Sequence, residues 1–155
     1  GSLGQGLSFS VGTALAGRLN LQQYGVYVLL GDGECDEGQV WEAAMAAAHF
    51  KLDNLVAIVD NNGQQIDGWN RDVMNLAPFN KKWQAFGWYV IEVDGHDFTK
   101  LLDAFNQAKS IKGQPAVILA HTIKGKGISF MENNLDFHGK APTAAQVEMA
   151  LKELE

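Results

Sequence analysis

The sequence contains one cysteine, Cys35, among 155 residues. A single cysteine excludes an intramolecular disulfide framework and a zinc site built from several cysteines, and it suits a reducing compartment. No apolar run reaches the ~18 residues of a membrane span, and no basic-plus-apolar signal segment is recognisable. Basic residues are also few, because 12 Lys and Arg stand against 18 Asp and Glu, a net charge of −6. We therefore expect a cytoplasmic protein without a broad surface for nucleic acid or an anionic membrane.

The residues that are present favour a folded chain. Hydrophobic residues make up 46% and aromatic residues 10% of the sequence, which disfavours disorder. A length of 155 residues fits one domain, spanning residues 1–155, and no internal repeat or linker divides it. Glycine is in excess, with 17 residues, which indicates several tight turns or close backbone approaches.

Short apolar runs alternate with segments of helical spacing. We expect strands at residues 26–30, 55–59, 88–93 and 115–120, and helices at 7–19, 37–50, 101–111 and from Thr143 onward. Residues 66–83 lack clear periodicity and predict a loop with short helical turns. The alternation predicts an α/β fold, in which helices flank both faces of a parallel sheet. In such sheets ligands bind at the carboxyl ends of the strands, where this chain places its polar, Gly-rich clusters.

The turn Gly31-Asp32-Gly33 follows the first expected strand, but it fits no common nucleotide-binding pattern. A dinucleotide fingerprint needs a third glycine where Asp36 stands, and the G-K-[ST] tripeptide of a phosphate loop is absent. An EF-hand loop starting at Asp32 needs glycine and glutamate where Glu37 and Ala43 stand. An unrelated nucleotide-binding α/β domain is therefore the weakest interpretation.

Polar residues after the first two strands suggest a metal site. Asp32 ends one strand and Asp60-Asn61-Asn62 ends the next, and neighbouring parallel strands lie only about 4.8 Å apart. Carboxylate, amide and carbonyl oxygens suit Mg²⁺ or Ca²⁺. Because so few protein ligands are present, a phosphorylated cofactor would complete the metal's shell. The alternative is that Asp32 only caps a helix and residues 61–63 only form a turn.

These clusters resemble those of the transketolase family. Gly31-Asp32-Gly33, separated by 27 residues from Asn61-Asn62, is similar to the thiamine diphosphate motif that opens with GDG and closes with NN. Other blocks resemble that family in the same order: residues 1–6 (GPLGQG), 31–42 (GDGxxxEGxxxE), 60–68 (DDNGxxIDG), 94–97 (DGHD) and 138–142 (HGAP, with one insertion). Ser2 in place of proline and the lysines of residues 124–127 resemble the split form, in which two shorter chains replace one long chain.

The resemblance assigns roles to individual residues. It implies a divalent metal, Mg²⁺ or alternatively Ca²⁺, held by the side chains of Asp32 and Asn62 and by the backbone carbonyl of Gln64. Its cofactor would be thiamine diphosphate. The expected cofactor-binding residues are Gly1, Ser2 and Leu3 at the aminopyrimidine end, Gly31, Asp32, Gly33 and Asn62 at the diphosphate, and His138 at the diphosphate or the substrate phosphate. Glu37 and Glu42 resemble family glutamates at the contact with the partner domain, and with His138 they form the expected catalytic set.

Other histidines and the tryptophans are expected to be structural. We expect structural roles for His49 and His121, and we expect His96 to hydrogen-bond within its own turn. The four tryptophans are expected to serve core or interface packing, not cofactor stacking: Trp41, Trp69, Trp83 and Trp88.

The resemblance implies transfer of a two-carbon ketol unit from a ketose to an aldose, with phosphorylated or unusual sugars, such as branched or sulfonated ones, as substrates. The expected partner is a C-terminal transketolase subunit that carries the pyrimidine-binding domain, in a homo- or hetero-oligomer. In this interpretation the chain is a diphosphate-binding domain without the segment that precedes the GSLGQG block in the family, and it is inactive alone. Two alternatives remain. One is the alpha subunit of a 2-oxo-acid dehydrogenase's first component, whose GQVFEA is similar to residues 38–43, and the other is an inert fragment that only folds and pairs.

Overall fold

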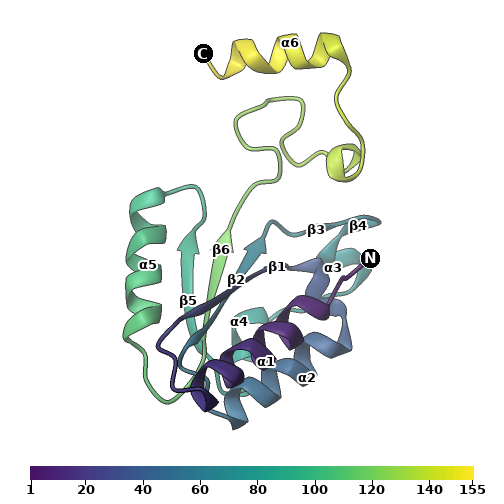
Figure 1. The fold of residues 1–155 in the computed structure, drawn as a ribbon. Coiled ribbons are helices and arrows are strands. Elements are labelled where there is room, and N and C mark those ends of the chain that lie inside the picture. The colour runs from purple at the N-terminus through teal and green to yellow at the C-terminus, as the bar shows by residue number, and fades with distance from the viewer.

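The computed structural model describes all residues from Gly1 to Glu155. Its centre is a four-stranded parallel sheet in the order β1-β2-β6-β5 (Figure 1). The strands are β1 (Val26–Gly31), β2 (Leu55–Asn61), β5 (Tyr89–Asp94) and β6 (Ala116–His121). Gly31 aligns with Asp60, and Asn61 aligns with His121, so the polar ends of three strands meet at one edge of the sheet. The predicted parallel sheet is confirmed.

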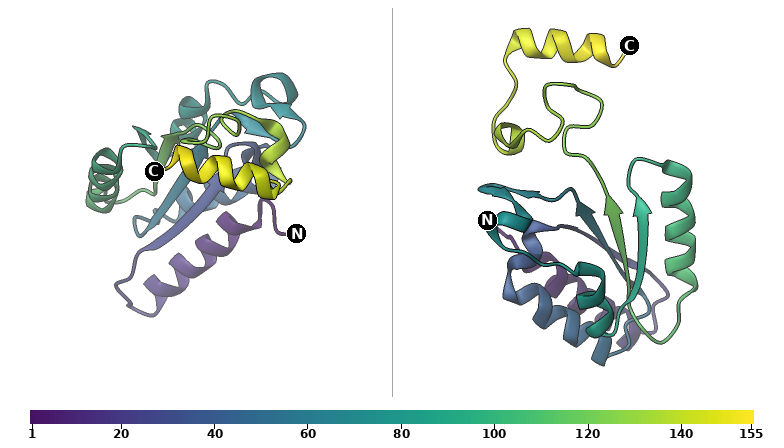
Figure 2. Two further views of the ribbon diagram at one scale, coloured as in Figure 1. Left: turned by 90° about the horizontal axis from the view of Figure 1, so that it is seen from above. Right: turned by 180° about the vertical axis from the view of Figure 1, so that it is seen from behind.

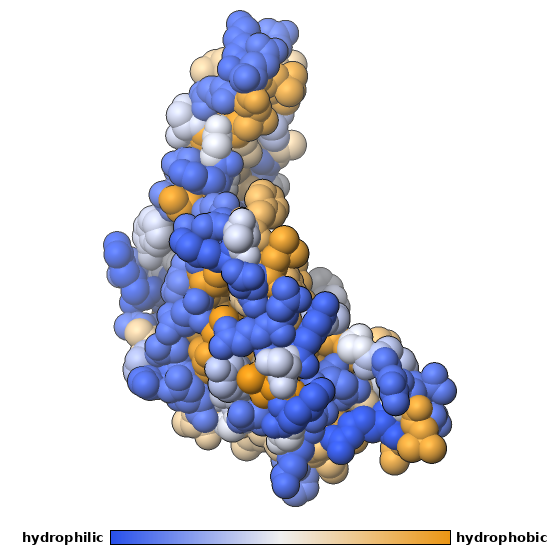
Figure 3. All heavy atoms as spheres, turned by 90° about the vertical axis from the view of Figure 1, so that its left-hand side faces the viewer, coloured by the Kyte–Doolittle hydropathy of each residue, from blue (hydrophilic) through white to orange (hydrophobic).

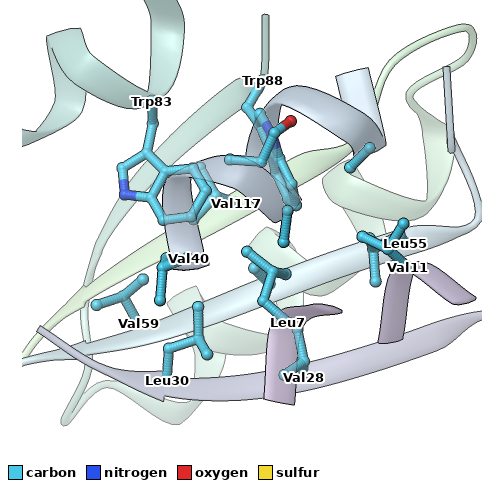
Figure 4. Packing of buried hydrophobic residues seen from close by; sticks show 14 of the residues in the cluster. Leu7, Val11, Val28, Leu30, Val40, Leu55, Val59, Trp83, Trp88 and Val117 are labelled. Atoms are coloured by element: carbon cyan, nitrogen blue, oxygen red, sulfur yellow. The ribbon is translucent and has the colours of Figure 1, made fainter. Parts of the chain in front are cut away.

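Helices cover both faces of the sheet, as the sequence predicts. On one face, α1 (Gln5–Leu19), α2 (Gly38–His49) and α4 (Phe79–Ala85) enclose a cluster of 18 buried residues. On the other face, α5 (Phe98–Ser110) packs over a smaller cluster of 8. Figure 4 shows the larger cluster, in which Leu7 of α1, Val40 of α2 and Val59 of β2 meet Trp83 and Trp88. This two-sided core holds the strand ends at fixed positions.

Element boundaries move slightly from the expected ones. The helix predicted at residues 101–111 begins at Phe98, because the Asp97 carboxylate accepts a hydrogen bond from the Lys100 N–H and caps it. Three tryptophans pack in the core as expected, while Trp69 lies under the Arg71 guanidinium. The predicted loop at residues 66–83 is only partly correct. A small antiparallel hairpin, β3 (Gln64–Gln65) and β4 (Gly68–Trp69), leads into α3 (Asn70–Val73) and α4.

The segment after β6 leaves the sheet and forms a narrow extension (Figures 1 and 2). It contains two short elements, the 3-10 turn η2 (Leu135–His138) and α6 (Ala144–Glu153). Thr143 caps α6 in a capping box with Gln146, as its position in the sequence predicts. The Ser129 N–H and hydroxyl both donate to the Glu153 carboxylate, which ties α6 back to the extension. None of the helices has the length and apolar character needed to cross a membrane.

Candidate functional site

A cleft of about 370 Å³ opens at the carboxyl edge of the sheet. Most of the predicted site residues line it: Leu3, Gly31, Asp32, Gly33, Asn62, Gln64 and His138. They come from the N-terminal segment, the β1 end, the loop after β2 and the η2 turn. The fold therefore brings together residues more than a hundred positions apart in the sequence.

Four predicted residues do not line the cleft. Gly1 and Ser2 are exposed beside Leu3, which does line it. Glu37 and Glu42 are exposed at the start of α2. The contact of these glutamates with a partner domain stays a prediction, as does the aminopyrimidine role of residues 1–3.

Asp32 is the most unusual residue of the cleft, because its side chain is ionisable and only 3% exposed. One carboxylate oxygen accepts the Gly33 N–H at 2.9 Å, and the other accepts the Gly63 N–H at 2.6 Å. Burial raises the pKa of this carboxyl, and the nearby Asp60 carboxylate adds to the rise, although the two N–H donors partly oppose it. No cationic side chain is paired with Asp32. The site thus contains a buried negative charge that a cation would stabilise.

The loop after β2 faces Asp32 from the next strand. The Asn62 Oδ1 accepts the Gln64 N–H at 2.9 Å, and its Nδ2 donates to Asp60 Oδ2 at 3.2 Å. Gly63 has a φ of +77°, so the tight turn that aims its N–H at Asp32 is readily available only to glycine. Gln64 is 3% exposed, and its Oε1 has no hydrogen-bond partner. Asp32, Asn62 and Gln64, which the sequence predicts as metal-binding, therefore lie together.

The fold itself gives a reason for glycine at position 33. A Cβ on this residue would lie 2.7 Å from the Gln65 Cβ of the hairpin. Its predicted close approach to a diphosphate stays a prediction, but the hairpin alone gives a physical reason for glycine here.

Glu34 joins two sides of the cleft, although it is not among the predicted site residues. Its Oε1 accepts the Gly4 N–H at 2.9 Å, and its Oε2 accepts the Gly31 N–H at 3.0 Å. One carboxylate therefore ties the start of α1 to the end of β1. Glutamate next to the GDG turn is the only local signal of this role, and it does not reveal that the N-terminal segment lies opposite.

The charges in the cleft are mostly negative. Its acidic side chains are Asp32, Glu34, Asp60 and Asp67, and its one lysine is Lys124, which lies near the exposed His138. Lys124 forms no ion pair. It lies three residues after the end of β6 at the same edge, a position that could have identified it from the sequence. A free diphosphate would meet mostly carboxylates here. A diphosphate that carries a divalent cation fits the charges of the cleft, because the cation can face the carboxylates while the diphosphate oxygens face Lys124.

The oxygen donors fit a divalent cation of the Mg²⁺ type. A carboxylate, an amide and a backbone carbonyl are hard ligands. No group of three or more His, Cys, Asp or Glu side chains converges in the structure, so the protein alone does not provide a full ligand shell of this kind. Magnesium typically keeps waters and phosphate oxygens, which matches a small protein ligand set beside a cleft.

Two histidines have contacts that differ from or extend the predictions. The His96 ring does not bond within its own turn: its Nε2 accepts the Ile123 N–H at 2.7 Å, across from β6. The predicted bond within the turn is made by the backbone, because the His96 N–H donates to Asp94 Oδ1 at 2.9 Å. The ring instead reaches Ile123, because the strand order places residues 94–97 against the end of β6. His121, predicted to be structural, accepts a hydrogen bond from Asn61 Nδ2 at its Nδ1 and donates from its Nε2 to Glu92 Oε2.

A parallel α/β sheet with a GDG turn and an Asn-rich loop side by side at its carboxyl edge is the arrangement that the sequence resemblance leads us to expect of a thiamine diphosphate-binding domain. The family model described as "Transketolase, thiamine diphosphate binding domain" matches residues 1–154. The chain therefore belongs to the transketolase family.

Relatives and solved structures agree with this family. The chain is 47% identical over its whole length to a 6-deoxy-6-sulfo-D-fructose transketolase subunit of a Clostridium species, of which it covers 56%. It is 44% identical over 99% of its length to an apulose-4-phosphate transketolase subunit of Phocaeicola vulgatus, of which it covers 55%. The crystal structure of Campylobacter jejuni transketolase superposes with a TM-score of 0.91 at 32% identity, covering 99% of this chain and 25% of that one. The chain thus spans about half the length of the subunit relatives that it matches.

Proposed function

We propose that this chain belongs to an enzyme that transfers a two-carbon ketol unit from a ketose to an aldose. In that enzyme it binds the diphosphate end of thiamine diphosphate together with a divalent metal ion. The observation that carries the proposal is the buried Asp32 carboxylate, 3% exposed and without a cationic partner, beside Asn62 in a cleft of a transketolase-family domain. Thiamine diphosphate, when bound, supplies the nucleophilic carbon that takes up the two-carbon unit. The chain's own residues bind and orient the cofactor.

The lining of the cleft and the resemblance to the family support the following roles. Asp32 and Asn62 offer side-chain oxygens to Mg²⁺, and Gln64 offers its backbone carbonyl. Lys124 offers its cation to the diphosphate oxygens, and His138, exposed at the mouth of the cleft, faces the diphosphate or a substrate phosphate. Gly31 and Gly33, which line the cleft, approach the diphosphate, and residues 1–3, of which Leu3 lines the cleft, bind at the aminopyrimidine end.

We further propose that a second subunit completes the site. Relatives of about twice this length are named as transketolase subunits, which supports a two-chain enzyme. The partner would carry the pyrimidine-binding domain and contact the exposed Glu37 and Glu42. In this arrangement the chain alone is inactive.

A reconstitution assay tests this function. The chain is combined with the candidate partner subunit, thiamine diphosphate and Mg²⁺, and ketol transfer is measured with xylulose 5-phosphate, apulose 4-phosphate and 6-deoxy-6-sulfo-D-fructose as donors. We expect turnover only when both subunits are present. We expect Asp32→Ala to lose more than the ~10–100-fold that groups supporting a metal ligand contribute.

Other results would favour the alternatives. Decarboxylation of 2-oxo acids with a beta-type partner would assign the chain to a 2-oxo-acid dehydrogenase. Assembly with the partner without cofactor binding or turnover would indicate a module that only folds and pairs. Ketol transfer by the chain alone would contradict the shared site.

A further inference from the structure

The turn formed by Asp94, Gly95, His96 and Asp97 lies against the end of β6, although the function proposed above gives it no role. The Gly95 N–H donates to the His121 carbonyl at 2.8 Å. A Cβ on Gly95 would overlap the Thr122 side chain and lie 3.1 Å from the same carbonyl. The turn therefore contacts the backbone of the segment after β6 at a distance that only glycine permits.

His96 makes the second contact of this turn with the segment. Its own N–H donates to Asp94 Oδ1 at 2.9 Å, which fixes the residue in the turn. Its ring Nε2 accepts the Ile123 N–H at 2.7 Å, so the ring carries its proton on Nδ1. Ile123 is the residue directly before Lys124.

Residues 122–124 are also held by the end of β2 and the loop that follows it. The Thr122 hydroxyl donates to Asp60 Oδ1, and the Thr122 N–H donates to the Asn61 carbonyl at 3.3 Å. The Lys124 carbonyl accepts the Asn133 N–H at 2.9 Å. The Asn133 carbonyl in turn accepts Gln64 Nε2 at 2.9 Å. Lys124 thus enters the cleft from a backbone that is held by His96 on one side and by residues 60–64 on the other.

We propose that His96 is a positioning residue for Lys124, and through it for binding of the diphosphate. This proposal rests on the function proposed above. His96 does not line the cleft, so any effect on the ligand must pass through the Ile123–Lys124 backbone. A displaced backbone would move the one lysine of the cleft away from an anion whose other neighbours are mostly carboxylates.

Two conservative variants separate this role from packing. In His96→Gln, the amide oxygen reaches about as far as Nε2 and can accept the Ile123 N–H, whereas the shorter His96→Asn cannot. Binding of thiamine diphosphate with Mg²⁺ to the full chain is measured by calorimetry, alongside thermal unfolding. We expect His96→Asn to bind about 3- to 10-fold more weakly, as for loss of one hydrogen bond, and His96→Gln to bind nearly as well as wild type. His49→Asn, an exposed residue on α2, is the matched control and should bind like wild type.

A double-mutant cycle with Lys124→Ala tests whether the effect passes through the lysine. We expect His96→Asn to have no further effect on binding once Lys124 is alanine. Amide exchange of Ile123 gives a readout without ligand: protection should fall in His96→Asn and persist in His96→Gln. An equal loss of affinity in both His96 variants, or an undiminished His96→Asn effect in the Lys124→Ala background, would overturn the positioning role alone. Absence of binding by wild type would overturn the proposed function and this inference together.

Discussion

Buried charge is the main feature of this protein at the scale of single residues. The Asp32 carboxylate lies 3% exposed against the Gly33 and Gly63 N–H groups, and burial raises its pKa. Hydrogen bonds offset part of the desolvation cost, and a bound divalent cation would offset more. A protein that keeps such a group without a cationic side chain beside it favours a ligand that brings the positive charge.

The network around His121 gives a pH prediction. Hydrogen bonds from Asn80 and His121 lower the pKa of Glu92 from its usual value of 4.5. A carboxyl with a lowered folded-state pKa stabilises the fold above about pH 4.5, and this contribution is lost as the pH falls through the folded-state value. Because Glu92 and His121 are about half exposed, the contribution should be less than ~1 kcal/mol.

The variant Glu92→Gln tests this prediction by urea unfolding at several pH values. It keeps an acceptor for Asn80 but cannot ionise. As the pH is lowered below about 4.5, we expect the free energy of unfolding to decrease more in wild type than in the variant. Parallel pH curves for the two proteins would show that the network contributes no pH-dependent stability.

Residue positions after strands were the strongest guide to the site. Asp32 and Asn62 could be predicted because each follows an apolar strand, and register in a parallel sheet brings such positions together. The role of Glu34 and the His96–Ile123 hydrogen bond could not be predicted. Each joins segments about thirty residues apart, and local sequence patterns do not encode the side-chain directions involved.

At the scale of elements, periodicity predicted the long helices and buried strands and failed for the short ones. The β3–β4 hairpin has two residues in each strand, too few for any alternation to be visible.

Helix α1 shows that a glycine in a helix does not by itself reveal close packing. Its interior glycines, Gly12 and Gly17, suggest close packing, yet only Gly17 has it, against the Tyr24 ring, and Gly12 faces open space.

These two glycines provide a matched pair on one helix. Gly12→Ala should raise the free energy of unfolding by about 0.5–1 kcal/mol, because alanine favours the helix and meets no atom. In Gly17→Ala the new Cβ would lie 2.7 Å from Tyr24 Cζ, and moving the ring weakens the bond from its hydroxyl to the Thr13 carbonyl. We expect this variant to be at least ~1 kcal/mol less stable than Gly12→Ala. Equal stabilities in chemical denaturation would show that the Tyr24 contact is not required.

At the scale of the whole molecule, the sheet and the extension form two parts of different character. The sheet buries its core on both faces, whereas α6 has no buried residue and its Met149 and Leu151 are more than half exposed. Figure 3 shows hydrophobic side chains along one side of this extension. Its residues Lys124 and His138 nevertheless reach the cleft. One side of the cleft is thus lined by a segment with little core of its own.

The central claim is that this cleft binds thiamine diphosphate through a divalent cation held by Asp32. Calorimetric titration of the full chain with thiamine diphosphate, with and without Mg²⁺, tests it most directly. Asp103→Ala, an exposed carboxylate on α5, is the matched control. We predict saturable binding that requires Mg²⁺, survives in Asp103→Ala and is lost in both Asp32→Ala and Asn62→Ala. Binding that is the same without Mg²⁺, or unchanged in Asp32→Ala, would contradict the claim.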